Sequence, residues 1–398
     1  MTAETSIGKK TVRDVDVAGK RVLVRVDLNV PIENGVVTDD TRIRESLPTV
    51  NYLIDHGARV ILCSHLGRPK GPDESLSLSH VAGRLGNLLN RDVLFADDCV
   101  GPLAERVVAT LLPHQVALLE NLRFHPEEEK NDPEFARQLA SLADLYVDDA
   151  FGSAHRAHAS TEGVTHYLPA VAGLLMEKEV RYLSALVANP PKPFAAVVGG
   201  AKVSTKIAAI DHLLPKLDML FLGGGMANTF LKATGVDVRM SLVEDEQVEV
   251  AKQILAEAKA KGVTVHLPVD VVAADQFAAD ADAREVAVSA VPRGYMILDI
   301  GPATVSAYAS ALKRAKAVVW NGPMGVFEME RFAAGSFGLA RAIAALQATT
   351  VVGGGETAAV VAHLGLEGQF THVSTGGGAS LEMLEGRELP GVAALLDS

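Results

Sequence analysis

The sequence predicts an α/β protein with two Rossmann-like, doubly wound parallel-sheet domains joined by a helix and a hinge. Short apolar runs that end in glycine or polar residues recur along the chain, and stretches rich in alanine, leucine and charge fill the gaps between them. Apolar runs without alternation indicate strands buried on both faces, as in parallel sheets covered by helices. A length of 398 residues also exceeds what one hydrophobic core usually supports, so we expect two domains.

The expected strands divide into two series. In the first half they are RVLVRVDLN (21–29), RVILCSHLG (59–67), DVLFADD (92–98), QVALLENLRF (115–124) and DLYVDDAFG (144–152). In the second half they are FAAVVGGA (194–201), MLFLGGG (219–225), VTVHLPVD (263–270), YMILDIGP (295–302), AVVWNGP (317–323) and TTVVGGGE (349–356). Ligands of such folds bind beyond the carboxyl ends of the strands, which is where most of the polar and glycine clusters lie.

A helix expected over residues 174–188 separates the two series, and the breaker NPPKP at 189–193 closes it. We therefore predict a first domain of residues 1–173, completed by a C-terminal tail from about residue 379 to 398. Residues 189–378 form the predicted second domain.

Composition excludes several classes of protein. A net charge of −12 argues against nucleic-acid and membrane-surface binding, and 48% hydrophobic with 22% charged residues argues against disorder. The two cysteines leave no room for a disulfide framework. The sequence has no run of eighteen apolar residues and no apolar signal segment near its start, so we expect a cytoplasmic protein that binds small molecules.

Basic residues gather at the strand ends of the first half. Positive groups on a loop of small residues, as in FGSAHRAHAS (151–160), can approach an anion closely. Arginine suits bidentate contact with carboxylate or phosphate, so the set indicates a small ligand with several negative charges. Each residue alone would more often be a solvated surface group or part of an ion pair.

Glycines gather at the strand ends of the second half. VVGGAKVSTK, FLGGGMANTF and VVGGGETAAV each place glycines between an apolar run and a helix-like stretch, which is typical of phosphate binding by backbone amides. They also allow close packing or turns without any ligand. No Walker sequence occurs. GGGETA at 353–358 fits the spacing G-x-G-x-x-A, which leaves a nicotinamide dehydrogenase open as an alternative.

Several longer blocks resemble the phosphoglycerate kinase family. They are RVLVRVDLNVP, SHLGRP, LLENLRFH, DDAFGSAHRAHAS, GGAKVSTKI, GGGMANTFL, WNGPMGVFE and STGGGASLE, and they run from residue 21 to 382 in the family's order. The resemblance implies transfer of a phosphoryl group from 1,3-bisphosphoglycerate to Mg-ADP, which gives 3-phosphoglycerate and ATP. It also implies a monomer whose C-terminal tail folds onto the first domain.

The resemblance also implies roles for individual residues. The cradle for 3-phosphoglycerate would consist of Asp27, Asn29, Arg42, His65, Arg68, Arg123 and Arg156, with Arg25, His155 and His158 in the rest of the basic patch. The nucleotide would be bound by Gly200, Lys202, Lys206, Gly224, Gly225, Gly301, Asn321, Pro323, Val326, Glu328, Gly353, Gly354 and Thr357. Arg42, Lys202 and Lys206 are the residues that we expect to act in catalysis.

One position departs from the family's pattern. Glu356 follows the triple glycine where aspartate is usual, in the stretch that helps to hold the nucleotide's magnesium. Its carboxylate is one methylene further from the backbone, so the ion could be held by a rearranged loop or through water. Glu356 is our candidate metal ligand, and complementing the helix dipole is its alternative role.

Two sites on separate domains must approach each other for transfer to occur. The hinge candidates are STGGGAS (374–380) and the helix near 174–187. A non-catalytic protein that binds anions is the remaining alternative.

Overall fold

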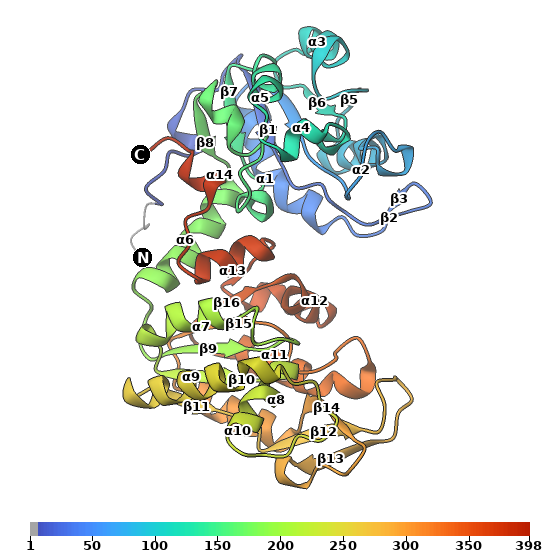
Figure 1. The fold of residues 1–398 in the computed structure, drawn as a ribbon. Coiled ribbons are helices and arrows are strands. Elements are labelled where there is room, and N and C mark those ends of the chain that lie inside the picture. The colour runs from blue at the N-terminus through green and yellow to red at the C-terminus, as the bar shows by residue number, and fades with distance from the viewer. Residues whose placement is uncertain (1–6) are drawn as a thin grey trace. The chain divides into compact units, whose positions relative to one another are not determined.

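The computed structural model describes residues 7–398, and the chain divides into two compact units. Unit 1 comprises the residues up to Arg181 together with Glu388–Ser398, and unit 2 comprises Tyr182–Arg387. Figure 1 traces the chain through both. Within residues 7–398, no helix combines the length and the apolar character that crossing a bilayer requires.

Unit 1 is built on a six-stranded parallel sheet in the order β5-β6-β4-β1-β7-β8. Its strands are β1 (Arg21–Arg25), β4 (Arg59–Cys63), β5 (Val93–Ala96), β6 (Val116–Leu119), β7 (Leu145–Asp148) and β8 (Ala170–Ala172). The five strands predicted in the first half are confirmed, and β8 was not predicted. The chain reverses its direction along the sheet between β1 and β7, the kind of switch point where such folds bind ligands.

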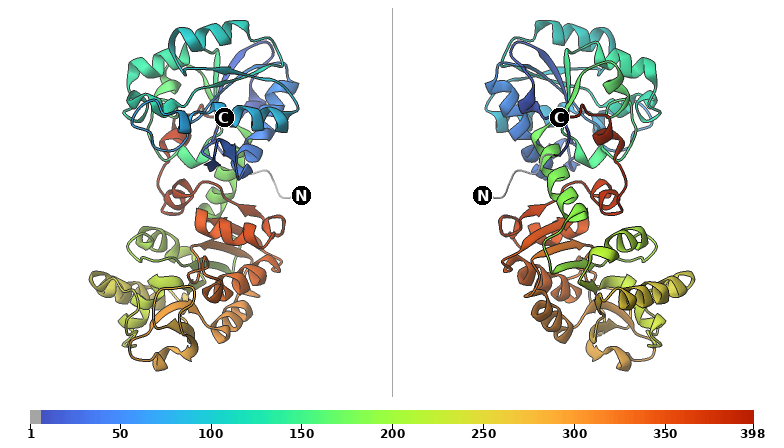
Figure 2. Two further views of the ribbon diagram at one scale, coloured as in Figure 1. Left: turned by 90° about the vertical axis from the view of Figure 1, so that its right-hand side faces the viewer. Right: turned by 90° about the vertical axis from the view of Figure 1, so that its left-hand side faces the viewer.

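Helices cover both faces of this sheet (Figure 2). They are α1 (Thr41–Asp55), α2 (Ser79–Leu89), α3 (Gly101–Thr110), α4 (Pro126–Glu129), α5 (Pro133–Ala140) and α14 (Pro390–Ala393). Val24 packs in one core cluster with Ile43 and Leu53 of α1, and its neighbour Leu23 is equally buried on the opposite face. Burial of successive residues explains why these strands are apolar without alternation. A two-stranded hairpin, β2 (Ile32–Glu33) and β3 (Val36–Val37), precedes α1.

Unit 2 contains a second six-stranded parallel sheet, in the order β11-β10-β9-β15-β16-β17. Its strands are β9 (Phe194–Val198), β10 (Met219–Leu222), β11 (Thr264–His266), β15 (Ala317–Asn321), β16 (Thr349–Gly353) and β17 (His372–Val373). Its helices are α7 (Ile207–Leu213), α8 (Gly224–Ala233), α9 (Val248–Ala260), α10 (Pro302–Leu312), α11 (Ala334–Ala344), α12 (Gly355–His363) and α13 (Gly378–Leu384). This strand order is that of dinucleotide-binding folds, with the switch point between β9 and β15.

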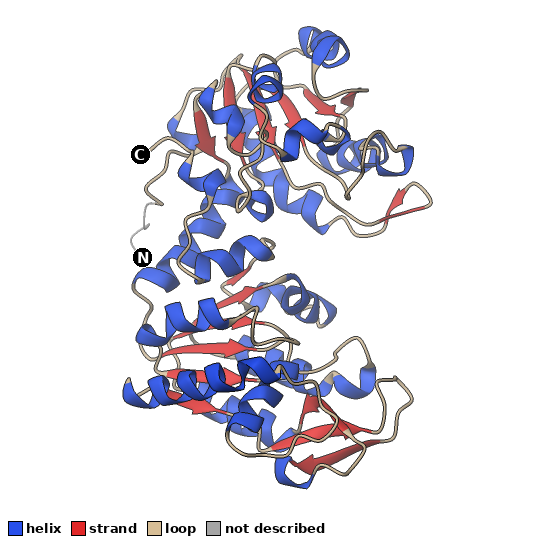
Figure 3. Ribbon diagram, in the orientation of Figure 1, coloured by secondary structure: helices blue, strands red, loops and turns tan. Residues whose placement is uncertain are grey.

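Unit 2 also holds a small sheet that differs from the prediction. Strands β12 (Asp270–Ala274), β13 (Ala283–Ala287) and β14 (Met296–Ile300) pair antiparallel, in the order β13-β12-β14 (Figure 3). The run at 295–302 is a strand, as predicted, but its place in a parallel sheet was wrong. A short apolar run indicates that a segment is buried, but it does not indicate which sheet the segment joins.

Helix α6 (Leu174–Ala188) carries the chain from one unit to the other, since the division falls between Arg181 and Tyr182. Residues 379–387, which the prediction assigns to the first domain, lie in unit 2, where α13 packs against α7. Residues 388–398 lie in unit 1, where the Leu396 backbone N–H donates to the Ala170 carbonyl oxygen of β8 at 2.9 Å.

Candidate active site

The basic residues of unit 1 meet at one edge of its sheet. Arg25 ends β1, His65 follows β4, Arg123 follows β6, and Arg156 with His158 follows β7. These four strands are consecutive parallel neighbours in the order β6-β4-β1-β7, so their carboxyl ends lie side by side. The structure therefore brings together residues that are up to 133 positions apart in the chain.

Arg25 lies beneath this edge. It is 1% exposed, and its guanidinium donates to the Ser160 Oγ at 3.0 Å, the Val26 carbonyl oxygen at 2.5 Å and the His65 Nδ1 at 2.9 Å. Arginine only donates, so Nδ1 of His65 is the acceptor and the neutral ring carries its proton on Nε2. Arg25 thus fixes both the position and the tautomer of His65.

His65 remains neutral over a wide pH range. Burial lowers its pKa well below the usual value, and the positive charges of Arg25, Arg123 and Arg42 lower it further. Three of the predicted arginines therefore act electrostatically on one ring. The neutral ring offers a directed N–H at Nε2.

Asp27 and Asn29 orient the cationic side of the site. Arg42, in the first turn of α1, donates from one nitrogen to both carboxylate oxygens of Asp27, at 3.1 and 3.0 Å. Asn29 Oδ1 accepts from the Gly67 backbone N–H at 2.9 Å and so ties the segment after β1 to the loop after β4. The contact with Asp27 uses one nitrogen of Arg42, so the other N–H groups of the guanidinium can bind a ligand.

Three further residues complete the set. Arg123 is partly buried and donates to the Gly67 carbonyl oxygen at 3.0 Å, whereas Arg68 and Arg156 are exposed. The His158 Nδ1 lies 3.5 Å from the Oε2 of the buried Glu128. Burial lowers the pKa of His158. His155 is half-buried on the same loop. The site thus combines exposed guanidinium groups with buried groups that hold the loops.

Unit 2 has a cavity of about 400 Å³ at the corresponding edge of its sheet. Its volume lies in the range of small-molecule sites. Seven of the predicted residues line it: Gly200, Gly224, Gly225, Pro323, Val326, Glu328 and Glu356. Seven further residues in its lining were not predicted: Ala201, Leu242, Phe277, Met296, Ile297, Leu298 and Gly325. One wall is therefore apolar, and it is built from β14 and two loops.

Glycine is required where the backbone segments of this cavity approach each other. Gly224 has φ +66°, and a Cβ there would lie 2.6 and 2.7 Å from the backbone O and N of Gly200. Because side chains rarely adopt this φ and backbone atoms cannot yield, no other residue fits. The contact holds the loop after β9 against the start of α8.

Lys206 and Asn321 form a polar pair beside the cavity. Lys206 Nζ donates to the Asn321 Oδ1, and burial lowers the pKa of Lys206, an effect that the charges of Glu356 and Glu385 oppose. The Asn321 Nδ2 is a buried donor with no acceptor among the described residues. An orphaned donor next to a buried ammonium group suits the oxygen of an anionic ligand.

The other predicted nucleotide residues lie outside the cavity lining. Thr357 Oγ1 accepts from the Gly322 backbone N–H at 2.7 Å and shapes the loop after β15, and Gly353 packs against Asn321. Gly301 precedes α10 and packs against the carboxylate of Asp270. Gly354, before α12, and the exposed Lys202, after β9, are likewise absent from the lining.

Leu242 and Phe277 line the cavity, but the sequence offered only weak grounds for predicting a role for them. They are 51% and 61% exposed, which is unusual for large apolar side chains. They lie in loops outside every predicted strand. Met296, Ile297 and Leu298 were predicted as a strand, but their place in the lining depends on the antiparallel sheet.

Comparison with known proteins identifies the family. Residues 12–387 match the phosphoglycerate kinase family. A relative from Moorella thermoacetica, named phosphoglycerate kinase, is 61% identical over 392 residues, which are 98% of this chain and 100% of the relative. The cytosolic phosphoglycerate kinase of Nicotiana tabacum is 56% identical over 403 residues, and both chains are covered in full.

The solved structures agree. The structure of phosphoglycerate kinase from Coxiella burnetii superposes with a TM-score of 0.88 at 44% sequence identity, over 97% of this chain and 98% of that chain. Similarity at these levels extends over both units and both sites. The chain therefore belongs to the phosphoglycerate kinase family and is a phosphotransferase.

Proposed function

We propose that this chain catalyses the reversible, Mg²⁺-dependent transfer of the acyl phosphate of 1,3-bisphosphoglycerate to ADP, giving 3-phosphoglycerate and ATP. The observation that carries the proposal is that this chain, a member of the family, has two different sites, each at the carboxyl ends of the strands of one sheet. One is lined by arginines and suits a small polyanion, and the other is a glycine-lined, partly apolar cavity of about 400 Å³ that suits a nucleotide.

In unit 1, the proposed cradle for 3-phosphoglycerate uses Arg42, Arg68, Arg123 and Arg156 as charged contacts. His65 donates from Nε2, and Asp27 with Asn29 holds the surrounding groups in place. Arg25, which is buried and bonded to His65, positions that ring and does not itself meet the ligand. His155 and His158 support the loop after β7.

In unit 2, the nucleoside occupies the cavity, with the base against its apolar wall and the ribose near Glu328. Lys206 and the orphaned Nδ2 of Asn321 face the phosphates, with Lys202 at the outer end. The glycines at 353 and 354 and Thr357 act by shaping the loops after β15 and β16.

The residues present fit the magnesium ion that accompanies ADP. Glu356 is exposed in the first turn of α12 and lines the cavity, and a carboxylate oxygen is a ligand that Mg²⁺ prefers. Its charge already acts on Lys206. When bound, the ion neutralises part of the phosphate charge, and Glu356 would hold it directly or through water.

The chemistry requires little from the protein beyond position and charge. The bond between phosphorus and the acyl oxygen breaks, a bond to a terminal oxygen of ADP forms, and both oxygens are already unprotonated, so no general base is needed. Catalysis then depends on alignment and on stabilising the charge of the transferring group. We assign this stabilisation to Arg42 from unit 1 and Lys206 from unit 2.

Transfer also requires the two units to approach each other and exclude water, which would hydrolyse the acyl phosphate. Residues 374–380 and helix α6 are the proposed hinges. The predicted domain limits, the monomeric state and the cytoplasmic location belong to this proposal, and relatives named cytosolic support the location. The proposed partners are small molecules, with no nucleic acid and no membrane.

The test is ATP formation by the purified chain from 1,3-bisphosphoglycerate and ADP, with and without Mg²⁺. Magnesium-dependent ATP formation is the expected result. Binding of 3-phosphoglycerate and ADP without turnover would identify a non-catalytic anion-binding protein. Binding of NAD more tightly than ADP, with a change in nicotinamide absorbance, would identify a dehydrogenase.

A further inference from the structure

Three side chains of different chemistry converge in unit 1 outside both sites described above. Asp98 and Cys99 lie in the turn between β5 and α3, and His125 lies between β6 and α4. Because β5 and β6 are paired parallel strands, their carboxyl ends bring these two segments together. One carboxylate oxygen, the thiol sulfur and one ring nitrogen all lie within 4.8 Å of one another.

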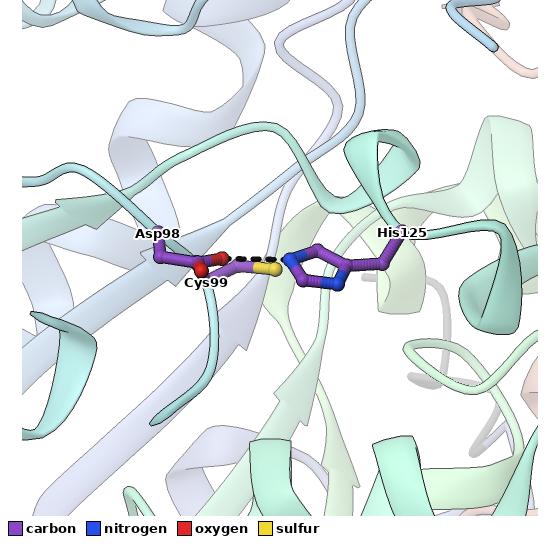
Figure 4. Close-up of side chains that lie close together, drawn as sticks. All are labelled: Asp98, Cys99 and His125. Carbon is purple, nitrogen blue, oxygen red and sulfur yellow. Dashed lines mark hydrogen bonds and ion pairs between the residues drawn. The ribbon is translucent and has the colours of Figure 1, made fainter. Parts of the chain in front are cut away.

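The three groups face one point. Figure 4 shows the Cys99 sulfur and a carboxylate oxygen of Asp98 directed at the same ring nitrogen of His125. The His125 Nε2 lies 2.7 Å from the Asp98 Oδ1, and the ring of Phe135 lies 5.3 Å from the His125 ring, between centroids, and restricts its movement. The arrangement is thus held from more than one side.

Cys99 is fully buried although its two companions are partly exposed. Its backbone N–H donates to the Asp98 Oδ1 at 2.7 Å. The buried sulfur therefore lies within reach of both the imidazole nitrogen and the carboxylate oxygen.

A cavity of about 430 Å³ lies beside this cluster. Asp98 and His125 are in its wall, and Asp73, Glu74, Asp97 and Glu120 add four more carboxylates. A space lined by negative charge with few compensating cations raises the local concentration of cations. The cavity also offers a route by which an ion and a water ligand reach the cluster.

We propose that Asp98, Cys99 and His125 form a binding site for a divalent cation of the zinc type, with a fourth position open to water in the cavity. Sulfur, imidazole nitrogen and carboxylate oxygen are the donors that zinc uses, at about 2.0–2.3 Å. Tetrahedral ligands are then about 3.3–3.7 Å apart. The three atoms already meet that requirement to within about 1 Å.

The donor set discriminates between metals. Magnesium takes oxygen ligands and keeps much of its water, so a site with a thiol and an imidazole selects against it. The site is therefore separate in chemistry, as well as in position, from the magnesium proposed at Glu356. Binding breaks the S–H bond of Cys99, releases that proton to solvent, and replaces the hydrogen bond between Asp98 and His125.

The site has a structural consequence for unit 1. His125 directly follows the short helix 122–124, which carries Arg123. A cation held between Cys99 and His125 would fix that helix to the start of α3. The ion thus supports the arginine without touching the substrate.

The test uses the full chain, stripped of metal by a chelator and titrated with Co²⁺ as a spectroscopic substitute for zinc. One equivalent should produce a thiolate-to-cobalt charge-transfer band and visible bands of tetrahedral intensity, which Zn²⁺ abolishes and a large excess of Mg²⁺ does not. Cys99→Ser should remove the charge-transfer band. Asp98→Asn and His125→Gln should weaken binding at least about 100-fold, because even residues behind metal ligands change affinity about 10–100-fold.

Two variants serve as matched controls. Cys63→Ala removes the only other cysteine of the chain, which is also buried, and Asp97→Asn removes a neighbouring carboxylate of the same cavity. Both should keep the band and the stoichiometry. Circular dichroism of each metal-free variant separates loss of the site from loss of the fold. A band that is absent in the wild type, survives in folded Cys99→Ser or disappears equally in Cys63→Ala overturns the proposal.

Discussion

Unit 1 and unit 2 share one architecture, six parallel strands with helices on both faces, yet their strand ends carry different chemistry. In unit 1 the groups that meet there are side chains, and three arginines lie around one neutral histidine. In unit 2 the backbone itself comes close to the cavity, because Gly200 and Gly224 leave no side chain between them. The same fold thus supplies positive character by guanidinium groups in one unit and by backbone amides and lysine in the other.

The difference predicts two kinds of sensitivity. Side-chain charge can be removed by one substitution and responds to pH, because crowded cations change the pKa of their neighbours. Backbone donors cannot be mutated away and do not titrate, but they are lost when a Cβ separates two segments. Unit 1 should therefore respond to changes of charge, and unit 2 to changes of volume.

The largest effect is expected when a positive charge is removed from the site of unit 1. Arg42→Ala should lower kcat for ATP formation about 10³–10⁵-fold, as removal of an arginine that stabilises a transferring phosphoryl group does. Arg44→Ala is the matched control, since Arg44 lies on the same helix and forms an ion pair with Asp40. Its kcat should remain within about twofold. Near-normal turnover by Arg42→Ala would remove that residue from the mechanism.

The second largest effect is expected when the close backbone contact between Gly200 and Gly224 in unit 2 is disrupted. Gly224→Ala places a Cβ 2.6 Å from the Gly200 carbonyl oxygen, and overpacking of this kind costs about 1–3 kcal/mol, or about 5- to 150-fold in the affinity for ADP. Calorimetric titration with ADP measures it. Gly235→Ala also has a positive φ but meets no atom within 4 Å, so it should lose stability and retain its affinity for ADP. Equal affinities in the two variants would show that the contact is not needed for binding.

The strand ends and their residue types could be predicted from the sequence, because a strand buried on both faces is apolar throughout and the next polar group marks its end. How deeply each of these residues is buried could not be predicted from the sequence. Arg25 was predicted to belong to the basic patch, but β1 is a central strand covered on both faces, so its last residue is buried beneath the site. The cluster of Asp98, Cys99 and His125 depends on which strands become neighbours, and no local pattern gives the strand order.

The stability of the protein should depend on pH through His65 of unit 1. The pKa of His65 is well below its unfolded value of about 6.5, so below that pH the unfolded chain binds a proton that the folded chain does not. The free energy of unfolding should therefore fall as the pH decreases from about 6.5, by up to about 1.4 kcal/mol per pH unit from this residue. Denaturant titrations between pH 7 and 5 measure this slope.

His65→Gln should flatten the slope, because glutamine does not titrate. His56→Gln, on the exposed end of α1, should leave the slope as in the wild type. A slope that is identical in His65→Gln and the wild type would place the pH response elsewhere.

The smallest expected effect concerns Glu356, one of the two acidic residues that line the cavity of about 400 Å³ in unit 2. Glu356→Asp should change turnover by no more than a few-fold, since both side chains offer a carboxylate and Mg²⁺ accepts water between itself and a ligand. The measurement is ATP formation at increasing Mg²⁺ for both proteins. Activity that appears only in Glu356→Asp would show that the extra methylene disables the metal site.

The position of the last residues has a consequence for how the chain is made. Lys10 donates its backbone N–H to the Leu396 carbonyl oxygen at 2.8 Å, and Leu396 in turn bonds to Ala170, so the edge of unit 1 is completed by residues near position 396. Roughly 200 residues of unit 2 lie between them and the rest of unit 1. At ribosomal rates of about 5–20 residues per second, unit 1 waits about 10–40 s for its final segment. A nascent chain therefore carries an unfinished first unit during the whole synthesis of the second.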